Sequence, residues 1–228
     1  MINWLHAKLH TPQRGWDPIP LEYARSYADL EWQKFDESPL QEIEEWLGGF
    51  SGKEVLDLGA GPGQFTGAIA RKGSRVTWHD ISKNYRKIAQ ERNLDLPIEY
   101  SLGYLEDAIA LGEGRFDLVF NRICWCYSRS DYGFAKLVWR LLRPGGVGYI
   151  DTSNASARSD TLTRSVRLRT WLNTRLSWKV GHPYPPHGRV AKLILQLPVD
   201  RVLVDYSRRS NDRVLFVRSV SSRCRQST

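Results

Sequence analysis

The stretch Glu54-Val-Leu-Asp-Leu-Gly-Ala-Gly-Pro-Gly-Gln-Phe-Thr66 decides the fold of this chain. Its apolar residues over 54–58 predict a short buried strand, and apolar residues at helical spacing predict a helix over 64–71. Between them glycine, which permits positive φ and close approach of a ligand, occupies alternate positions, namely Gly59, Gly61 and Gly63. A strand, a glycine loop and a helix N-terminus in this order are typical of a nucleotide-binding βαβ unit.

The spacing of the glycines separates this loop from two common phosphate-binding motifs. The dinucleotide fingerprint G-x-G-x-x-G needs a glycine where this chain has Gln64, and the motif G-x-x-x-x-G-K-[ST] is absent. The pattern D-x-G-x-G-x-G instead resembles motif I of the class I S-adenosylmethionine (SAM) methyltransferases. The resemblance implies SAM as cofactor, held by the loop residues Asp57, Gly59, Ala60, Gly61 and Gly63.

A carboxylate follows the second predicted strand, which covers residues 75–78. Asp80 lies 21 residues beyond Gly59, where a carboxylate can accept hydrogen bonds from both hydroxyls of a ribose. The alternative role for Asp80 is to cap the helix predicted over 82–92, but Ser82 can fill that role. We therefore expect Asp80 and the adjacent Ile81 to contact the cofactor.

The loop after the third predicted strand, residues 98–101, is the expected adenine site. In the resembling family this loop holds the adenine, commonly through an acidic residue directly after a glycine. Here Gly103 is followed by Tyr104, which departs from that pattern. We expect Tyr104 to stack on the base, with the Leu105 backbone and Glu106 as further contacts.

The fourth predicted strand covers 116–121 and ends at Asn121, so the loop over 121–127 is expected to line the site, because ligands of open α/β sheets bind at the carboxyl ends of the strands. Trp125 and Tyr127 could present aromatic faces to a sulfonium, or belong to the core. The pair Cys124-x-Cys126 lacks matching His or Cys partners at ligand spacing, so we predict no metal.

A second match to the same family follows. Leu141-Leu-Arg-Pro-Gly-Gly146 ends a helix predicted over 132–142 and precedes a strand over 147–152. With motif I, Asp80 and the Phe116-Asp-Leu-Val119 strand, the resemblance covers residues 54–154. It is most similar to the small-molecule branch that includes quinone-biosynthesis methyltransferases, and the nucleic-acid base signature N-P-P-Y is missing. It implies a doubly wound, Rossmann-like α/β fold with a seven-stranded, mostly parallel sheet, in the order 3-2-1-4-5-7-6 with an antiparallel last strand.

Residues 1–50 precede the nucleotide-binding unit and are expected to form a helical cover. An irregular arm over 1–20 is followed by predicted helices over 21–35 and 38–47. The second helix has the pattern of a capping box starting at Ser38 and ends at Gly48-Gly49. In related enzymes such leading helices cover the substrate pocket, so Tyr27 is a candidate substrate contact, although packing on the sheet would explain the same pattern.

Residues 156–187 form an insertion before the last helix, which is predicted over 188–197. A predicted helix in it carries Leu168, Trp171, Leu172 and Leu176 on one face beside several arginines. We interpret it as a packed lid with Trp171 near the substrate; a membrane-surface helix and an RNA contact are the alternatives. His182, which precedes the last helix, is the candidate general base for a hydroxyl substrate. A hairpin over 201–220 closes the predicted fold.

Composition sets wider bounds. The 228 residues fit one domain, with a SAM-binding core over 51–155 and a C-terminal helix and hairpin over 188–228. A net charge of +8 and a pI near 9.5 suggest anionic partners: nucleic acid, phosphorylated substrates or a membrane surface. Three cysteines argue against a secreted disulfide scaffold, and no segment predicts a signal peptide or a transmembrane helix, so we expect a cytoplasmic protein. Nothing indicates the oligomeric state.

The resemblance to the methyltransferase family implies a SAM-dependent methyltransferase. It would transfer methyl to an oxygen or nitrogen of a small-molecule acceptor, whose carboxylate or phosphate the arginines of the insertion could attract. The alternative enzymatic function, which we favour less, is RNA methylation. A SAM-binding regulator without catalysis is the alternative from a different class.

Overall fold

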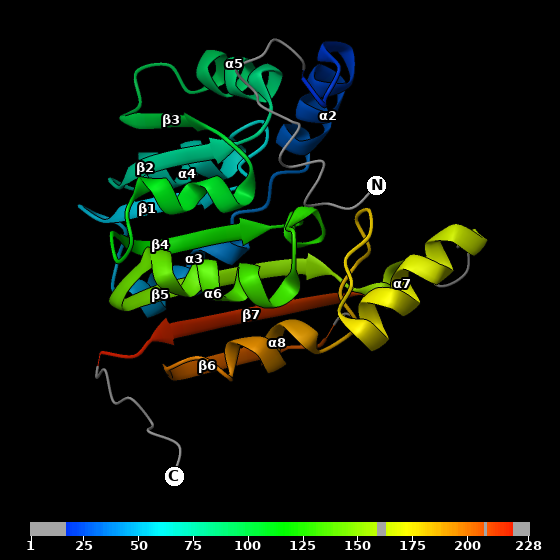
Figure 1. The fold of residues 1–228 in the computed structure, drawn as a ribbon. Helices are drawn as coiled ribbons and strands as arrows, with labels where there is room; N and C mark the ends of the chain where they lie inside the picture. The colour runs from blue at the N-terminus through cyan, green and yellow to red at the C-terminus, as the bar shows by residue number, and fades with distance from the viewer. Residues whose placement is uncertain (1–16, 159–162, 208, 221–228) are drawn as a thin grey trace.

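The computed structural model describes residues 17–158, 163–207 and 209–220 (Figure 1). The predicted irregular arm, apart from residues 17–20, and the residues after 220 lie outside this part of the chain. A seven-stranded sheet runs through the middle of the molecule in the order β3-β2-β1-β4-β5-β7-β6, as predicted. Strands β1 to β5 are parallel, and β7 is antiparallel to both β5 and β6. The strands are β1 Glu54–Leu58, β2 Arg75–Asp80, β3 Ile98–Leu102, β4 Phe116–Arg122, β5 Leu142–Ser153, β6 Val199–Asp205 and β7 Asn211–Arg218.

Helices cover both faces of this sheet. They are α2 Leu21–Gln33, α3 Ser38–Leu47, α4 Gln64–Arg71, α5 Lys83–Arg92, α6 Asp131–Leu141, α7 Arg164–Leu176 and α8 Arg189–Ile194, with short 3-10 turns η2 Leu105–Leu111, η3 Trp125–Tyr127 and η4 Ala155–Arg158. The last helix, α8, is shorter at both ends than the predicted span of 188–197. In Figure 1, α7 extends away from the sheet at the side to which the parallel strands point.

The core has two main layers because successive side chains of a buried strand face opposite sides of the sheet. On β1, Val55 packs with the cluster that includes residues of α3 and α4. Leu56 and Leu58 pack with the cluster that includes residues of η2, α6 and α8. A third cluster joins α2 and α5 around the fully buried Trp78 of β2. This third cluster holds α2 beside the carboxyl end of the sheet.

Of the two helix N-caps predicted from the sequence, one is confirmed and one is wrong. Ser82 caps α5 as predicted, because its side chain accepts a hydrogen bond from the Tyr85 N–H. The predicted capping box at Ser38 is wrong: Ser38 is already helical, and its hydroxyl donates to the Asp36 carboxylate instead of receiving a helix N–H. Gly48 ends α3 at a φ of 69°, a left-handed conformation that glycine adopts without strain.

Candidate functional site

A cavity of about 670 Å³ lies at the carboxyl ends of β1 to β4. The loops after these strands form its floor, because parallel strands bring their carboxyl ends to one edge of the sheet. α2 and the segment before α8 provide other parts of the wall. Most of the predicted site residues line it, namely Asp57, Gly59, Ala60, Gly61, Asp80, Ile81, Tyr104, Leu105, Tyr27, Tyr127 and His182.

The glycine loop is held against the end of β2. The backbone N–H groups of Gly59 and Ala60 donate to the His79 carbonyl at 2.8 and 3.2 Å. The Gly61 N–H donates to Asp80 Oδ2 at 3.0 Å, and the Trp78 indole donates to the Gly61 carbonyl at 3.0 Å. A single strand end therefore fixes the course of the loop.

The glycines of this loop serve different purposes. A Cβ on Gly59 would lie 2.6 Å from Cys124 Sγ, so the loop after β4 leaves no room for a side chain there. A Cβ on Gly63 would lie 2.7 Å from the Ala89 Cβ, so this glycine permits α4 and α5 to approach. A Cβ on Gly61 would meet nothing within 4 Å. Gly61 is therefore the glycine whose missing side chain leaves space to the cavity.

Two carboxylates on the cavity wall have raised pKa values. Burial raises the pKa of Asp80 to about 6, against the opposing effect of N–H groups from Ser82 and Gly61. Burial likewise raises the pKa of Asp57 to about 7, although the Thr66 hydroxyl donates to it at 2.5 Å. Removing a carboxylate from water disfavours its charged form. A positively charged ligand in the cavity would favour that form again.

Aromatic rings form another part of the cavity wall. Tyr27 of α2 stacks on Tyr23, with ring centroids 6.1 Å apart, and lies beside Tyr85 of α5 at 6.0 Å. Tyr127 lies against His182, with ring centroids 4.9 Å apart. Burial raises the pKa of both Tyr27 and Tyr127, so their phenols stay neutral. This wall offers π faces and uncharged hydroxyl groups.

The structure does not bring five of the predicted residues to the cavity. They are Gly63, Glu106, Asn121, Trp125 and Trp171. Glu106 accepts the Arg129 backbone N–H at 2.6 Å, and the Asn121 amide donates to the Leu58 carbonyl at 2.8 Å. Trp125 is fully buried in the core and donates its indole N–H to Asp131. Trp171 lies on α7 with 53% of its surface exposed. For Trp125 the core alternative is therefore correct.

Three polar residues that sequence reasoning missed also line the cavity: Glu31, Gln64 and Arg122. Arg122 lies 3.7 Å from carboxylate oxygens of both Glu31 and Asp151. The signals were present, since Gln64 directly follows the glycine loop and Arg122 directly follows the predicted strand end. Glu31 is one helical turn from Tyr27 on α2, which places both on one face.

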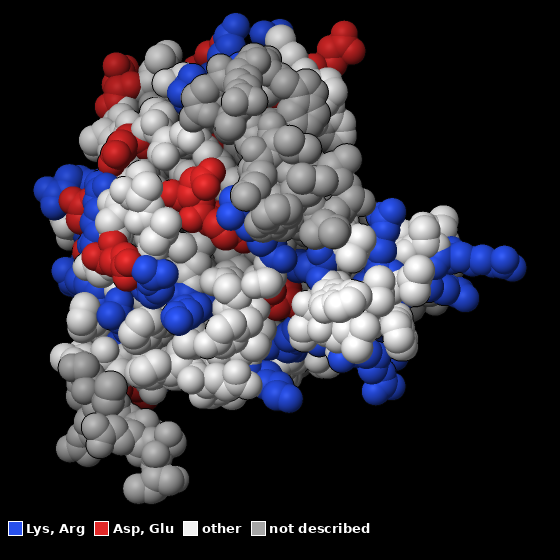
Figure 2. Space-filling view, viewed as in Figure 1, with Lys and Arg blue, Asp and Glu red and all other residues white. Residues whose placement is uncertain are grey.

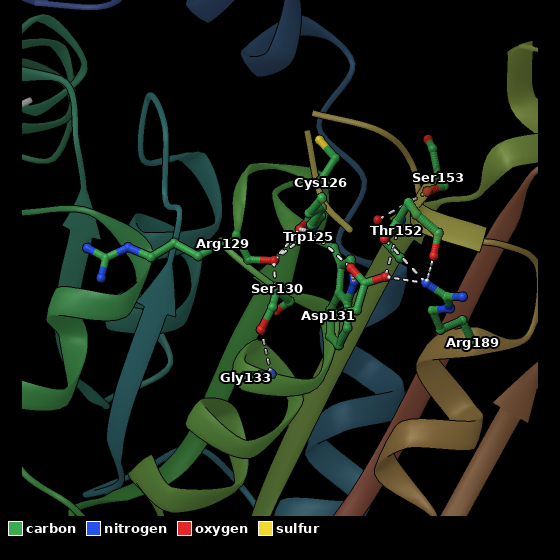
Figure 3. Close-up of polar contacts among 12 residues, drawn as sticks. Trp125, Cys126, Arg129, Ser130, Asp131, Gly133, Thr152, Ser153 and Arg189 are labelled. Atoms are coloured by element: carbon green, nitrogen blue, oxygen red, sulfur yellow. Dashed lines mark hydrogen bonds and ion pairs between the residues drawn. The ribbon is translucent and has the colours of Figure 1, made fainter. Parts of the chain in front are cut away.

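A buried ionic cluster supports the wall that carries Tyr127 and His182 (Figure 3). Asp131 lies between Trp125 and Arg189, whose indole and guanidinium donate to its two oxygens at 2.8 and 3.2 Å. Lys179, with a side chain only 1% exposed, reaches Asp131 at 2.9 Å and donates to the Trp125 carbonyl at 2.8 Å. Trp125 and Lys179 are close in sequence to Tyr127 and His182, so the cluster fixes both backbone segments.

The charges of this cluster favour ionised Asp131. Burial by itself raises the pKa of Asp131, but the Lys179 ammonium and hydrogen bonds from Lys179 and Trp125 lower it more, so the pKa lies below its ordinary value. Asn173 of α7 also donates to Asp131, at 3.3 Å. This contact attaches α7 to the rest of the domain.

The predicted apolar face of α7 does not pack on the domain over most of its residues, whereas the role of 156–187 as a lid stays a prediction. Leu168, Trp171 and Leu176 are each about half exposed, and Asn173 is the buried residue of this helix. Basic side chains project from α7 at the right of Figure 2, and the α7 arginines do not line the cavity. The helix is attached by polar contacts to Asp131 and Arg189 instead of by an apolar face.

Within the described parts of the chain, no group of three or more His, Cys, Asp or Glu side chains is placed to hold a metal ion. Over the same residues, no helix has the length and apolar character needed to cross a bilayer.

Comparisons with known proteins agree with this geometry. A family model described as a methyltransferase domain matches residues 56–150. A ubiquinone biosynthesis O-methyltransferase of Chromobacterium violaceum is 29% identical over 153 residues, which are 63% of this chain and 66% of that protein. In four such bacterial relatives the match spans only 45 to 66% of their length.

Solved structures share the fold. A putative SAM-dependent methyltransferase from Listeria monocytogenes superposes with a TM-score of 0.62 at 19% identity, covering 79% of this chain and 96% of that one. A SAM-dependent methyltransferase from Mesorhizobium loti superposes with a TM-score of 0.61 at 18% identity, covering 82% and 100%.

We predict that the Asp131→Asn variant loses about 3–5 kcal/mol of unfolding free energy, because the buried Lys179 and the partly buried Arg189 would lose their counter-charge. Urea unfolding followed by tryptophan fluorescence at pH 7 measures this loss. The Glu44→Gln variant, which breaks the more exposed pair with Lys72, should cost no more than about 1 kcal/mol. Equal losses in the two variants would contradict the role given to the cluster.

The ion pair between Asp131 and Lys179 also predicts how the free energy of unfolding depends on pH. The folded-state pKa of Asp131 lies below the unfolded value. Its contribution is therefore present above the unfolded pKa, about 3.9, and is lost as the pH falls through the folded value. The stability difference between wild type and Asp131→Asn should shrink on acidification below about pH 4. A difference that grew on acidification would show that the sign is wrong.

Proposed function

Because the chain belongs to the class I S-adenosylmethionine-dependent methyltransferases, we propose that it transfers the methyl group of SAM to a hydroxyl oxygen of a small aromatic molecule. The observation that carries this proposal is the shared cavity of the glycine loop, Asp80 and an aromatic wall. The names of the bacterial relatives support oxygen over nitrogen as the methylated atom.

The residues at the cavity fit SAM. The carboxylate of Asp80 accepts two backbone N–H groups, and its remaining lone pairs would accept the ribose hydroxyls. Tyr104 and Leu105, on the loop after β3, would contact the adenine. The open space at Gly61 would let the ligand approach the loop backbone. Asp57 and Asp80 together supply negative potential for a cationic ligand.

When bound, SAM supplies a methyl group on a sulfonium, which is already a good leaving group. The protein is then required chiefly to hold the acceptor in line and to exclude water. The rings of Tyr27 and Tyr127 suit a positively charged group, because aromatic faces attract cations. His182, which lies against Tyr127 on the cavity wall, would accept the hydroxyl proton of the acceptor.

The lining of the cavity supports a neutral acceptor over the anionic one expected from composition. Three carboxylates line it, those of Glu31, Asp57 and Asp80, and Arg122 lies between Glu31 and Asp151. The arginines of α7, which motivated the expectation, lie elsewhere. A phenol placed among tyrosine rings would meet matching π surfaces.

Calorimetry with SAM, its demethylated product and NAD, followed by mass spectrometry of hydroxylated aromatic compounds incubated with SAM, tests the proposal. We expect binding of SAM and of the demethylated product, no tight binding of NAD, and methylation on oxygen. Tight NAD binding without SAM binding would overturn the cofactor assignment. Methylation confined to RNA would replace the small-molecule proposal by the alternative predicted from the basic insertion.

We predict that Gly61→Ala folds but binds SAM at least about tenfold more weakly, because its methyl group would enter the space left to the ligand. Gly48→Ala is the matched control, since Gly48 also has a positive φ and open surroundings but lies at the end of α3. Calorimetry should show unchanged SAM affinity in this control. Unchanged affinity in Gly61→Ala would remove the loop from the binding site.

A pH dependence of SAM binding follows from Asp80. Its pKa of about 6 means that the carboxylate is charged above this pH and increasingly neutral below it. SAM affinity should therefore fall by roughly tenfold between pH 7 and pH 5. In Asp80→Asn we expect weaker binding at pH 7 and a flatter profile. Calorimetry across this range measures both, and a profile identical in the two proteins would exclude Asp80 from the site.

A further inference from the structure

A second cavity of about 340 Å³ adjoins the first. The two cavities share four lining residues, which are Glu31, Gln64, Phe65 and Arg122. The second cavity is bounded by the end of α2, the start of α3 and the ends of β5 to β7. Most of its other lining is polar, namely Lys34, Asp36, Ser38, Asp151, Asp205, Ser207, Asn211 and Arg213. The second cavity therefore extends the first one and has a more polar lining.

Gln64 stands at the junction with an unsatisfied polar atom. Its side chain is only 6% exposed, and its Nε2 donates to Glu31 Oε2 at 3.3 Å. Its Oε1 is buried and has no hydrogen-bond partner among the residues that the structure describes. The amide orientation is set by Glu31, because a carboxylate only accepts hydrogen bonds from such a group. The remaining oxygen is a buried acceptor without a donor, which is costly for a folded protein.

The two arginines that line the second cavity each lie between carboxylates. Arg122 lies between Glu31 and Asp151, at 3.7 Å from each. Arg213 lies between Glu42 and Asp205, at 3.1 and 2.6 Å. An anion would compete with these carboxylates, and an apolar chain would remove polar groups from water without replacing their hydrogen bonds. A neutral chain with hydroxyl groups avoids both costs.

We propose that the methyl acceptor reaches past Gln64 into the second cavity through a neutral, hydroxyl-bearing arm. One hydroxyl of this arm donates to Gln64 Oε1, and the aromatic head stays in the first cavity. The proposal rests on the proposed function, because it assigns both cavities to one acceptor. It makes Gln64 a specificity-determining residue, which selects acceptors by the polarity of the arm.

The test uses two catechols as probes that differ by one terminal hydroxyl: 3-(3,4-dihydroxyphenyl)propan-1-ol and 4-propylcatechol. Their affinities for the full chain saturated with S-adenosylhomocysteine are measured by calorimetry. We expect the hydroxyl-bearing probe to bind wild type at least about fivefold more tightly, the effect of one hydrogen bond to a buried acceptor. In Gln64→Leu this preference should disappear, while Gln41→Leu, an exposed position on α3, should retain it. Gln64→Ala removes the same oxygen and serves if the leucine variant does not fold.

Four results would overturn the proposal: equal affinities or tighter binding of 4-propylcatechol in wild type, a preference that survives in Gln64→Leu, no binding of either probe, or a tenfold loss of S-adenosylhomocysteine affinity in Gln64→Leu. The last result would assign Gln64 to the cofactor. Wild type that binds neither SAM nor S-adenosylhomocysteine would instead refute the proposed function, so the two failures are distinguishable.

Discussion

The hydrogen bonds between the end of β2 and the glycine loop after β1 are the constraint on which the site depends. The His79 carbonyl receives two N–H groups of this loop, and the Asp80 carboxylate receives a third, from Gly61. Cys124, from the loop after β4, occupies the space where a Cβ on Gly59 would lie. Three strand ends are thereby held in one arrangement, and the cavity is the space that they leave. A loop satisfied by the neighbouring strand needs no ligand to define its course.

The cavity wall that carries Tyr127 and His182 is held by buried ionic contacts. There the chain relies on Asp131, Lys179 and Arg189, which are mostly removed from water and satisfy one another. Replacing such a cluster with apolar side chains need not reduce stability. We therefore assign it mainly the role of positioning the backbone around it. It helps to define the course of two short segments, before Tyr127 and before His182, that lie outside the long helices and strands. It also explains how α7 is attached while Leu168 and Trp171 on its surface stay exposed.

Sequence reasoning succeeded for the glycine loop, the buried strands and the Ser82 cap, and it failed for the capping box at Ser38. The glycine spacing and the apolar strands predicted the strand–loop–helix unit and the position of the cavity, and the resemblance to the methyltransferase family implied the strand order. Sequence reasoning also failed where a side chain had two plausible partners. Glu106 and Asn121 lie in the expected loop and strand end, but each uses its polar group on nearby backbone, at Arg129 and Leu58. Trp125 was equally suited to a cation or to the core, and only the position of Asp131 decides between them.

The sequence by itself determined the first strand, the loop of positive-φ glycines and the carboxylate at the end of the second strand, because these follow from backbone geometry and from the period of buried side chains. The doubly wound sheet was implied by the resemblance of these motifs to the methyltransferase family. Only the tertiary structure decided that Glu31, Gln64 and Arg122 meet at the junction of two cavities. These residues come from α2, α4 and β4, and their contacts depend on how the helices cross the sheet. Tertiary packing likewise decided that α7 presents its apolar side chains to water. The periodicity of a helix shows that apolar residues share a face, but not which surface that face meets.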